Sequence, residues 1–192
     1  MKRLFYLLAA AAFTACGSAT TLSVMTFNMR YDNPEDGADN WRFRRGRVAE
    51  VIASHGVDVF GTQELLANQL GDLKRLLPGY AAVGVGREDG AEAGEFSAVF
   101  YRRDRFTPLE SGTFWLSETP DVAGSKGWDG ACERVATWVV LHDREGGREF
   151  LFVNTHLDHV GQVARDEGVN LLRERIEALR GDLSLIHISE PT

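Results

Sequence analysis

Two polar side chains, Asn28 and Glu64, stand at the ends of segments that read as strands. If these strands are neighbours in a layered α/β sheet, both side chains reach the crevice at the strand ends, where such sheets bind ligands. Mg²⁺ is commonly held by one or two carboxylates, with water and substrate phosphate completing its shell, so Glu64 alone could anchor it. The structural alternative is that Asn28 caps a turn and Glu64 starts a helix, where the dipole favours an acid.

A second group of polar residues follows the run from Phe152 to Thr155. That run predicts a buried strand, so His156 emerges where the sheet meets solvent and could donate to a phosphate oxygen or move a proton. Asp158 and His159 lie close by and favour a polar site, although both also fit a simple strand end. Arg134 precedes another predicted strand and could bind phosphate through its planar guanidinium; the alternative is an ordinary surface charge.

Three other patterns carry little weight. The segment Gly84, Val85 and Gly86 is not followed by a predicted helix, which argues against a dinucleotide-binding loop. Ser97 and Ser111 lack the strand-turn-helix context of a nucleophile elbow. The two cysteines are too few for a structural zinc site.

The elements that must position these residues begin in the order strand, helix, strand, helix, which is the opening of a layered α/β domain. Residues 22–28 contain no breaker and predict a strand buried on both faces, and residues 57–61 predict a second strand that delivers Glu64 to its carboxyl end. Apolar residues at helical spacing predict two helices. They are Trp41, Val48 and Ile52, ending near Gly56, and Leu66, Leu70, Leu73 and Leu77, ending at Pro78 and Gly79.

The second half of the chain predicts two antiparallel hairpins, residues 96–101 with 106–111 and residues 135–143 with 149–156. Residues 116–133 between them form a long loop, and an ordered loop of this length is usually functional. The last predicted helix carries Val169, Leu172, Ile176 and Leu179 on one face. A length of 192 residues with 44% hydrophobic composition favours one globular domain, which we place at residues 20–183.

Residues 1–19 read as a targeting segment, because a basic start is followed by an apolar run too short to span a bilayer stably. Two outcomes stay open: cleavage before Cys16 with a lipid added to its thiol, or ordinary signal-peptide cleavage just after it. Both predict a secreted or periplasmic protein or an outer-membrane lipoprotein, attached to membrane only through lipid on Cys16. Cys132 alone then remains, so no internal disulfide is available.

The formal net charge is -7, and residues 1–19 contribute only positive charges to it. An acidic chain is poorly suited to hold long nucleic acid by broad phosphate neutralisation. Of the phosphate groups that the polar residues above could bind, those of lipid head groups, sugar phosphates and short nucleotides fit this charge better than those of long nucleic acid, although an acidic nuclease also fits. No protein partner is indicated.

Residues 184–192 break the pattern of the preceding helix. They neither continue it nor form a plausible closing element, and they resemble read-through into a sequencing adapter. We therefore interpret these nine residues as a foreign tail, a hypothesis that resequencing the locus can test.

Several motifs, read in order, resemble the endonuclease/exonuclease/phosphatase family. The run Met25 to Asp32 resembles its opening strand motif, and Gly61 to Glu64 resembles its metal-binding Gln-Glu motif. The segments Phe114 to Ser117 with Gly127 to Asp129, and Asn154 to His159, resemble a bacterial secreted branch. The resemblance runs from about Leu22 to about Asp182.

The resemblance implies an α+β (α/β) fold, a DNase I-like four-layer sandwich of two mixed sheets packed face to face with helices outside. It implies a metal site with Glu64 as the principal Mg²⁺ ligand, Mn²⁺ being the alternative, and Asn28 supporting metal and phosphate. It assigns His156 to the scissile phosphate, making it catalytic together with Asn28 and Glu64. Substrate binding falls to Arg134, Asn154 and Asp158. The implied reaction is hydrolysis of a phosphoester in a small molecule, a lipid head group or nucleic acid.

The sequence departs from the family pattern near its end. The Gly-Asp-Phe-Asn strand end and the closing Ser-Asp-His motif are absent, and Gly181 with Asp182 does not replace them. We therefore expect a fold that is incomplete at the C-terminus and a chain that is inactive, as a fragment of an active phosphodiesterase, phosphatase or nuclease. The alternative from another class is a non-catalytic envelope binding module on the same fold; the joint presence of Asn28, Glu64 and His156 favours an enzyme ancestor.

Overall fold

The computed structural model of the chain describes residues 20–181 and 183–189. In chain order its elements are β1 (Val24–Asn28), a short 3₁₀ helix η1 (Pro34–Asp39), α1 (Trp41–Ser54), β2 (Val59–Gln63), α2 (Ala67–Leu76), β3 (Tyr80–Val83), β4 (Val99–Arg102), β5 (Phe106–Trp115), β6 (Val135–Asp143), β7 (Arg148–Thr155), α3 (Gln162–Arg180) and β8 (Ser184–Ser189).

The strands form two sheets of four strands each. The first has the order β1-β2-β4-β3, in which β1 runs parallel to β2 and the other neighbours are antiparallel. The second has the order β5-β6-β7-β8, in which the first three strands are antiparallel and β8 runs parallel to β7. The expectation of an α+β fold with two sheets is confirmed.

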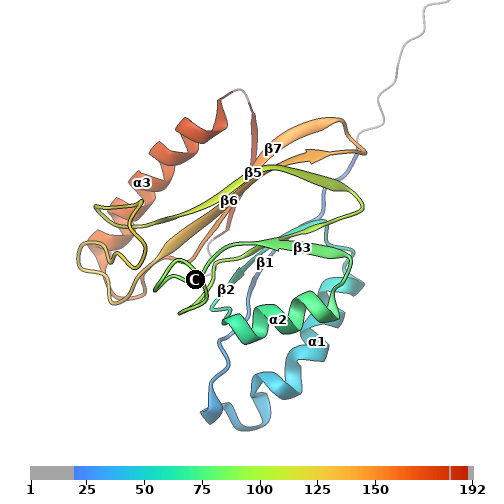
Figure 1. The fold of residues 1–192 in the computed structure, drawn as a ribbon, viewed down its shortest axis with the longest axis horizontal. Helices are drawn as coiled ribbons and strands as arrows, with labels where there is room; N and C mark the ends of the chain where they lie inside the picture. The colour runs from blue at the N-terminus through green and yellow to red at the C-terminus, as the bar shows by residue number, and fades with distance from the viewer. Residues whose placement is uncertain (1–19, 182, 190–192) are drawn as a thin grey trace, which may run out of the picture.

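The sheets and helices stack in four layers, which Figure 1 shows as α1 with α2, the first sheet, the second sheet and α3. Three clusters of buried apolar side chains fill the spaces between the layers. Successive residues of a strand point to opposite faces, so Phe60 packs toward α1 and α2 while its neighbour Val59 packs between the sheets. Strand β2 is buried along its whole length because layers cover both of its faces.

The first strand differs from the sequence prediction. Residues 22–28 were expected to be buried on both faces, but β1 lies at the edge of its sheet and its residues are partly buried, with Thr26 exposed. An apolar, β-branched run does not by itself distinguish a central strand from an edge strand, because the neighbours are set by topology.

The helices follow their predicted spacing with one exception. Trp41, Val48 and Ile52 are buried on α1, and Leu73 is buried on α2. On α3 the buried residues recur four apart, namely Ala164, Gly168, Leu172 and Ile176. Val169 was predicted on this face but is 49% exposed, because it lies beside this narrow stripe and not on it.

One of the two predicted hairpins is absent. Strands β6 and β7 form the expected antiparallel pair. Strands β4 and β5 do not pair, because the turn between them carries the chain from the first sheet to the second. Arg105 in this turn is 4% exposed and donates to Asp58 at 2.7 Å and to Asp143 at 2.8 and 3.0 Å. These carboxylates stand at the start of β2 and the end of β6, so the buried ion pairs tie the two sheets together at this crossing.

The sequence analysis made specific predictions for the two ends of the chain. Residues 184–192 were not expected to form a closing element, yet Ser184–Ser189 form β8 beside β7. This corrects the structural expectation, while the foreign origin of these residues stays a hypothesis. The predicted targeting segment lies outside the described residues. Within the described part, no helix combines the length and apolar character needed to cross a bilayer.

Replacing Arg105 by Met is expected to lower the free energy of unfolding by about 3–5 kcal/mol, because two buried carboxylates lose their cation. Urea denaturation followed by circular dichroism measures the change. Arg148→Met is the matched control, since Arg148 is exposed, and it should shift stability by no more than about 0.5 kcal/mol. Equal losses in the two variants would contradict the structural role of Arg105.

The same cluster predicts a pH dependence. Hydrogen bonds from Arg105 hold the pKa of Asp143 below its usual value, against the opposing effect of burial. Its charged form therefore stabilises the fold above the ordinary Asp pKa, and that stabilisation is lost as the pH falls through the lowered value. The stability gap between the wild type and Asp143→Asn should shrink on acidification from about pH 7 to about pH 3 or below. Glu110→Gln, at an exposed position, should show no such trend; a gap for Asp143→Asn that stays constant would count against this assignment.

Candidate active site

A pocket of about 430 Å³ lies where the carboxyl ends of β1 and β2 meet the end of β7 and the start of β6. It is lined by Asn28, Arg30, Tyr31, Glu64, Arg87, Glu95, Cys132, Arg134, His156 and His159. Four of the residues predicted from the sequence are therefore together: Asn28, Glu64, Arg134 and His156. The pairing of the strands explains this, because Asn28 lies opposite Gln63, and Thr155 lies opposite Ala136.

Glu64 stands at the junction of β2 and α2 with a backbone φ of 56°. A positive φ is uncommon for a residue other than glycine, and such strain concentrates at functional sites. It accompanies a carboxylate that lines the pocket. The Asn28 Nδ2 group donates to Oε1 of Glu64 at 2.9 Å, and the Tyr31 backbone N–H donates to Oε2 at 3.3 Å.

Asn28 lines the pocket and contacts the Glu64 carboxylate directly. Its Oδ1 accepts a hydrogen bond from the Arg30 backbone N–H at 2.9 Å, and its amide nitrogen faces Glu64. In this arrangement Asn28 orients the carboxylate, and its contact with a metal stays a prediction. Glu64 is thus the hard-oxygen ligand that this part of the pocket offers to a divalent cation.

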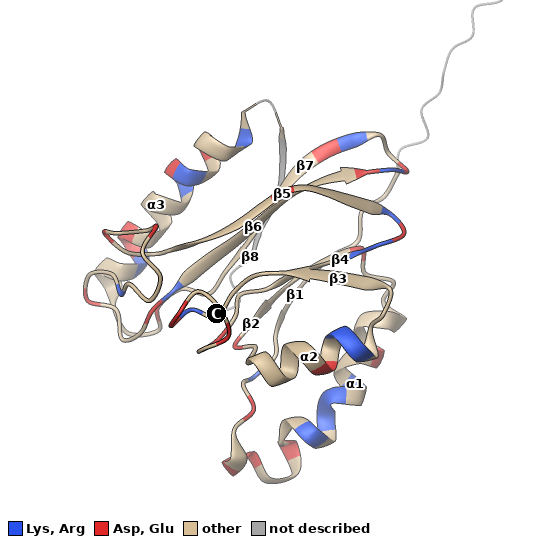
Figure 2. Ribbon diagram, in the orientation of Figure 1, with Lys and Arg blue, Asp and Glu red and all other residues tan. Residues whose placement is uncertain are grey.

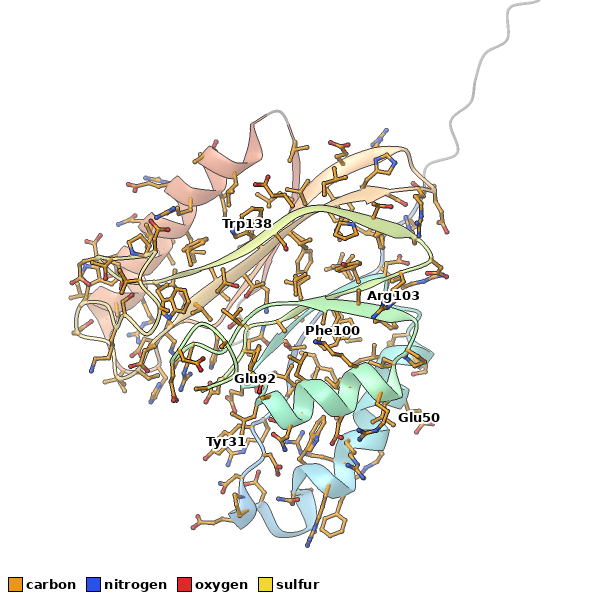
Figure 3. The ribbon with its side chains drawn as sticks, viewed as in Figure 1. Tyr31, Glu50, Glu92, Phe100, Arg103 and Trp138 are labelled. Carbon is orange, nitrogen blue, oxygen red and sulfur yellow. The ribbon has the colours of Figure 1, made fainter. Side chains whose placement is uncertain are left out.

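Gln69 supports this arrangement through hydrogen bonds of its side chain. It was not singled out from the sequence. It is fully buried on α2, where its Oε1 accepts from the backbone N–H groups of Leu66 and Asp32 at 3.0 and 3.1 Å. Its Nε2 donates to the Arg30 carbonyl oxygen at 3.0 Å. The loop after β1 is thereby joined to the start of α2. Tyr31, labelled in Figure 3, belongs to this loop. A glutamine on the buried face of a helix was the available signal.

His156 directly follows β7, as predicted, and its Nε2 lies 3.9 Å from Oε1 of Glu64. Burial lowers the pKa of His156 to about 4; the Arg134 cation also lowers it, and Glu64 only partly opposes these effects. The imidazole is therefore neutral near pH 7. A neutral ring can exchange hydrogen bonds with a phosphate group without adding a charge to the pocket.

Arg134 is 6% exposed and lines the pocket just before β6. Its Nη2 lies 3.0 Å from Nδ1 of His159, and its Nε lies 3.5 Å from Oδ2 of Asp158. The sequence alternative of an ordinary surface charge is wrong, because the side chain is buried. A buried guanidinium at the wall of a pocket is suited to bind a phosphate oxygen.

Asp158 was expected to bind substrate, but it is 3% exposed and does not line the pocket. Its carboxylate accepts from the backbone N–H groups of Ala131, Val160 and Gly161 at 3.0, 2.9 and 2.7 Å. Burial favours its neutral form, but these hydrogen bonds outweigh that effect and hold the pKa of Asp158 well below its usual value. It therefore fixes the loop and faces Arg134 as a permanent anion.

Asn154 was also expected to bind substrate, yet it is 0% exposed and lies outside the pocket lining. Its Nδ2 donates to the carbonyl oxygens of Thr62 and Ala98 at 2.8 and 3.1 Å, and its Oδ1 accepts from Gln63 Nε2 at 2.8 Å. This side chain therefore connects β7 of the second sheet to the first sheet. Its role is to position the site.

Arg87 and Glu95 complete the pocket and were missed from the sequence. They lie on the loop between β3 and β4 and pair at 2.6 Å. Burial raises the pKa of Glu95, and the Arg87 cation opposes only part of this effect. The loop contacts the end of β5, since Trp115 Nε1 donates to the Arg87 carbonyl oxygen at 2.6 Å. The glycines around this charged pair were the signal for an ordered loop.

The sequence model of the endonuclease/exonuclease/phosphatase family matches residues 25–191. The structure of a mannosyl-6-phosphatase from Bacteroides thetaiotaomicron is similar, with 45% identity and a TM-score of 0.85, and the match covers 88% of this chain and 64% of that one. An endonuclease/exonuclease/phosphatase from Bacteroides vulgatus matches with 45% identity and a TM-score of 0.85, over 87% of this chain and 64% of that one.

A curated relative is more distant. The CCR4-Not complex 3′-5′-exoribonuclease subunit of Aspergillus clavatus is 25% identical over an alignment of 173 residues, and the match covers 75% of this chain and 26% of that protein. The chain therefore spans only part of the length of each of these relatives.

The contact between the sheets predicts a strong effect of Gly61→Ala. A Cβ atom at Gly61 would lie 2.3 Å from Oδ1 of Asn154, so the substitution should destabilise the fold by about 1–3 kcal/mol. Gly71→Ala is the matched control, because no atom lies within 4 Å of a Cβ there, and in a helix it should stabilise by about 0.5–1 kcal/mol. Thermal and urea denaturation measure both. A neutral Gly61→Ala would show that Asn154 does not hold the sheets at this distance.

Proposed function

Since the chain belongs to the endonuclease/exonuclease/phosphatase family, we propose that it forms the phosphate-binding part of a divalent-metal-dependent phosphomonoesterase for phosphorylated sugars and similar small alcohols. The observation that carries this proposal is the convergence of Glu64, His156 and Arg134 on one pocket. The fold is that of the family's phosphoester hydrolases. That the substrate is a phosphomonoester, and that its alcohol is a sugar, is what we propose.

The donor set fits a hard divalent cation. The Glu64 carboxylate faces the pocket and is oriented by N–H donors from Asn28 and Tyr31, and carboxylate oxygen is what Mg²⁺ and Mn²⁺ prefer. Glu64 would hold the cation, with water and substrate phosphate completing the shell. When bound, such a cation neutralises charge on the phosphate and on the leaving oxygen.

The residues of the chain supply the remaining roles that we propose. Arg134 binds a phosphate oxygen, and Asp158 keeps its guanidinium in place. His156, close to Glu64, hydrogen-bonds the same phosphate group. Asn28 maintains the direction of the Glu64 carboxylate through its 2.9 Å hydrogen bond. Together these contacts orient the phosphoester for attack by water, which is the positioning contribution that such sites make to the rate.

Size and charge favour a small substrate. The pocket holds about 430 Å³, which suits a phosphorylated monosaccharide better than a nucleic-acid strand. Basic residues gather on the outer helix α1, where Arg42, Arg45 and Arg47 are exposed, while the chain as a whole is acidic (Figure 2). A relative of 45% identity is a mannosyl-6-phosphatase, which supports a sugar phosphate as substrate. The predicted targeting segment supports a proposed location outside the cytoplasm.

Glu64→Gln is expected to weaken Mg²⁺ binding by about tenfold or more, because the charged ligand is lost. Isothermal titration of the whole chain with MgCl₂ measures this, and Mn²⁺ gives an independent paramagnetic readout. Glu50→Gln is the matched control, since Glu50 is an exposed residue of α1 outside the pocket lining, and Figure 3 labels it apart from Tyr31, which does line the pocket. Equal Mg²⁺ affinity in the wild type and the Glu64 variant would remove the metal role.

Turnover is then compared, with Mg²⁺ present and in a longer form that carries the family's later motifs, as phosphate released from mannose 6-phosphate and as p-nitrophenol released from bis-p-nitrophenyl phosphate. Preference for the monoester supports the proposal, and preference for the diester contradicts it. Binding of mannose 6-phosphate without turnover in a longer form that carries the family's later motifs would favour the non-catalytic binding module.

A further inference from the structure

The contact between Arg134 and His159 determines which nitrogen of the histidine carries the proton. Arg134 Nη2 lies 3.0 Å from Nδ1 of His159. A guanidinium can only donate, so Nδ1 accepts this hydrogen bond. The ring proton is therefore on Nε2, on the other side of the ring.

Arg134 can impose this state because it is itself held in place. Its side chain is 7% exposed, and its Nε faces the buried Asp158 carboxylate at 3.5 Å. The oxygens of Asp158 accept hydrogen bonds from the backbone N–H groups of Ala131, in the segment before β6, and Gly161, in the segment before α3. Asp158 thus positions Arg134, and Arg134 in turn positions His159.

A metal ion is an alternative ligand for this cluster, since ligand atoms of Cys132, Asp158 and His159 lie within 4.8 Å of one another. Two observations argue against it. The Arg134 guanidinium contacts both Asp158 and His159, so its charge repels a second cation. The Asp158 oxygens already accept several N–H groups, which leaves them poor ligands. The cluster is therefore better suited to orient a donor than to bind a metal.

The position of His159 indicates which part of a substrate it meets. Arg134 is buried and acts electrostatically on His156, which adjoins Glu64, so the phosphate end belongs at that side. His159 lines the same pocket but is exposed, so it lies toward the opening, where the alcohol portion of a phosphomonoester emerges. Within residues 20–181 and 183–189, Nε2 of His159 has no hydrogen-bond partner.

We propose that His159 is a specificity-determining residue, held by Arg134 as an Nε2–H donor that binds a hydroxyl or ring oxygen of the alcohol portion of the substrate. This inference deepens the proposed function and rests on it. It names the substrate class as monoesters of polyhydroxylated alcohols. An apolar leaving group cannot accept this hydrogen bond and leaves the donor without a partner, which is how polar pockets discriminate.

The test compares binding of mannose 6-phosphate and phenyl phosphate to the whole chain in the presence of Mg²⁺. His159→Phe removes the donor and keeps a flat ring, so the preference for mannose 6-phosphate should fall about threefold to tenfold, the effect of one hydrogen bond. His159→Gln places an N–H near the original Nε2 and should retain most of the preference. His142→Phe, on β6, is the matched control and should leave the preference unchanged.

A second readout does not depend on the substrate. Nitrogen-15 NMR of labelled histidines should show His159 protonated at Nε2 in the wild type and a mixture of tautomers in Arg134→Met. Protonation at Nδ1 in the wild type, or an unchanged preference in His159→Phe, would overturn the inference. Failure of the wild type to bind either ester would instead overturn the proposed function from which the inference starts.

Discussion

The site depends on one buried polar contact between the two sheets. Asn154, on β7, donates to two carbonyl oxygens of the first sheet and accepts from Gln63. Gln63 is followed by Glu64, and Asn154 precedes His156 by two residues, so the contact brings the carboxylate and the imidazole within 3.9 Å. A buried amide that satisfies its hydrogen bonds in only one arrangement specifies the register of the sheets more strictly than apolar packing can. Gly61 permits this close approach because it has no Cβ.

At the opposite end of the sheets, buried ion pairs also hold the two sheets together. Arg105 pairs with Asp58 and Asp143 in a buried cluster where the chain crosses between the sheets. The sheets are thus held by an amide network near the pocket and by ion pairs away from it. Neither of these contacts uses an arginine that lines the pocket. Arg134 in particular has a fixed anion on one side and a polarised histidine on the other.

The pocket wall consists largely of residues whose positions are set by backbone hydrogen bonds. Asp158 binds N–H groups from two loops, and Gln69 joins the loop after β1 to the start of α2. Neither side chain lines the pocket. Both explain how loops, which are usually the most variable part of a fold, can present charged groups at fixed separations.

The sequence alone determined the helices, the strands that bear Asn28, Glu64 and His156, and the long ordered loop, because periodicity and breakers are local properties. It also indicated the chemistry, since the types of these residues suit a metal and a phosphate. Only the tertiary structure decided that β4 and β5 lie in different sheets, that β1 is an edge strand, and that Asn154 and Asp158 position the site without lining it. The sequence also did not predict that Arg87 pairs with Glu95 or that Arg134 contacts His159. These features depend on partners far apart in the chain, and a side chain's partner and burial are set by packing, which residue spacing does not encode.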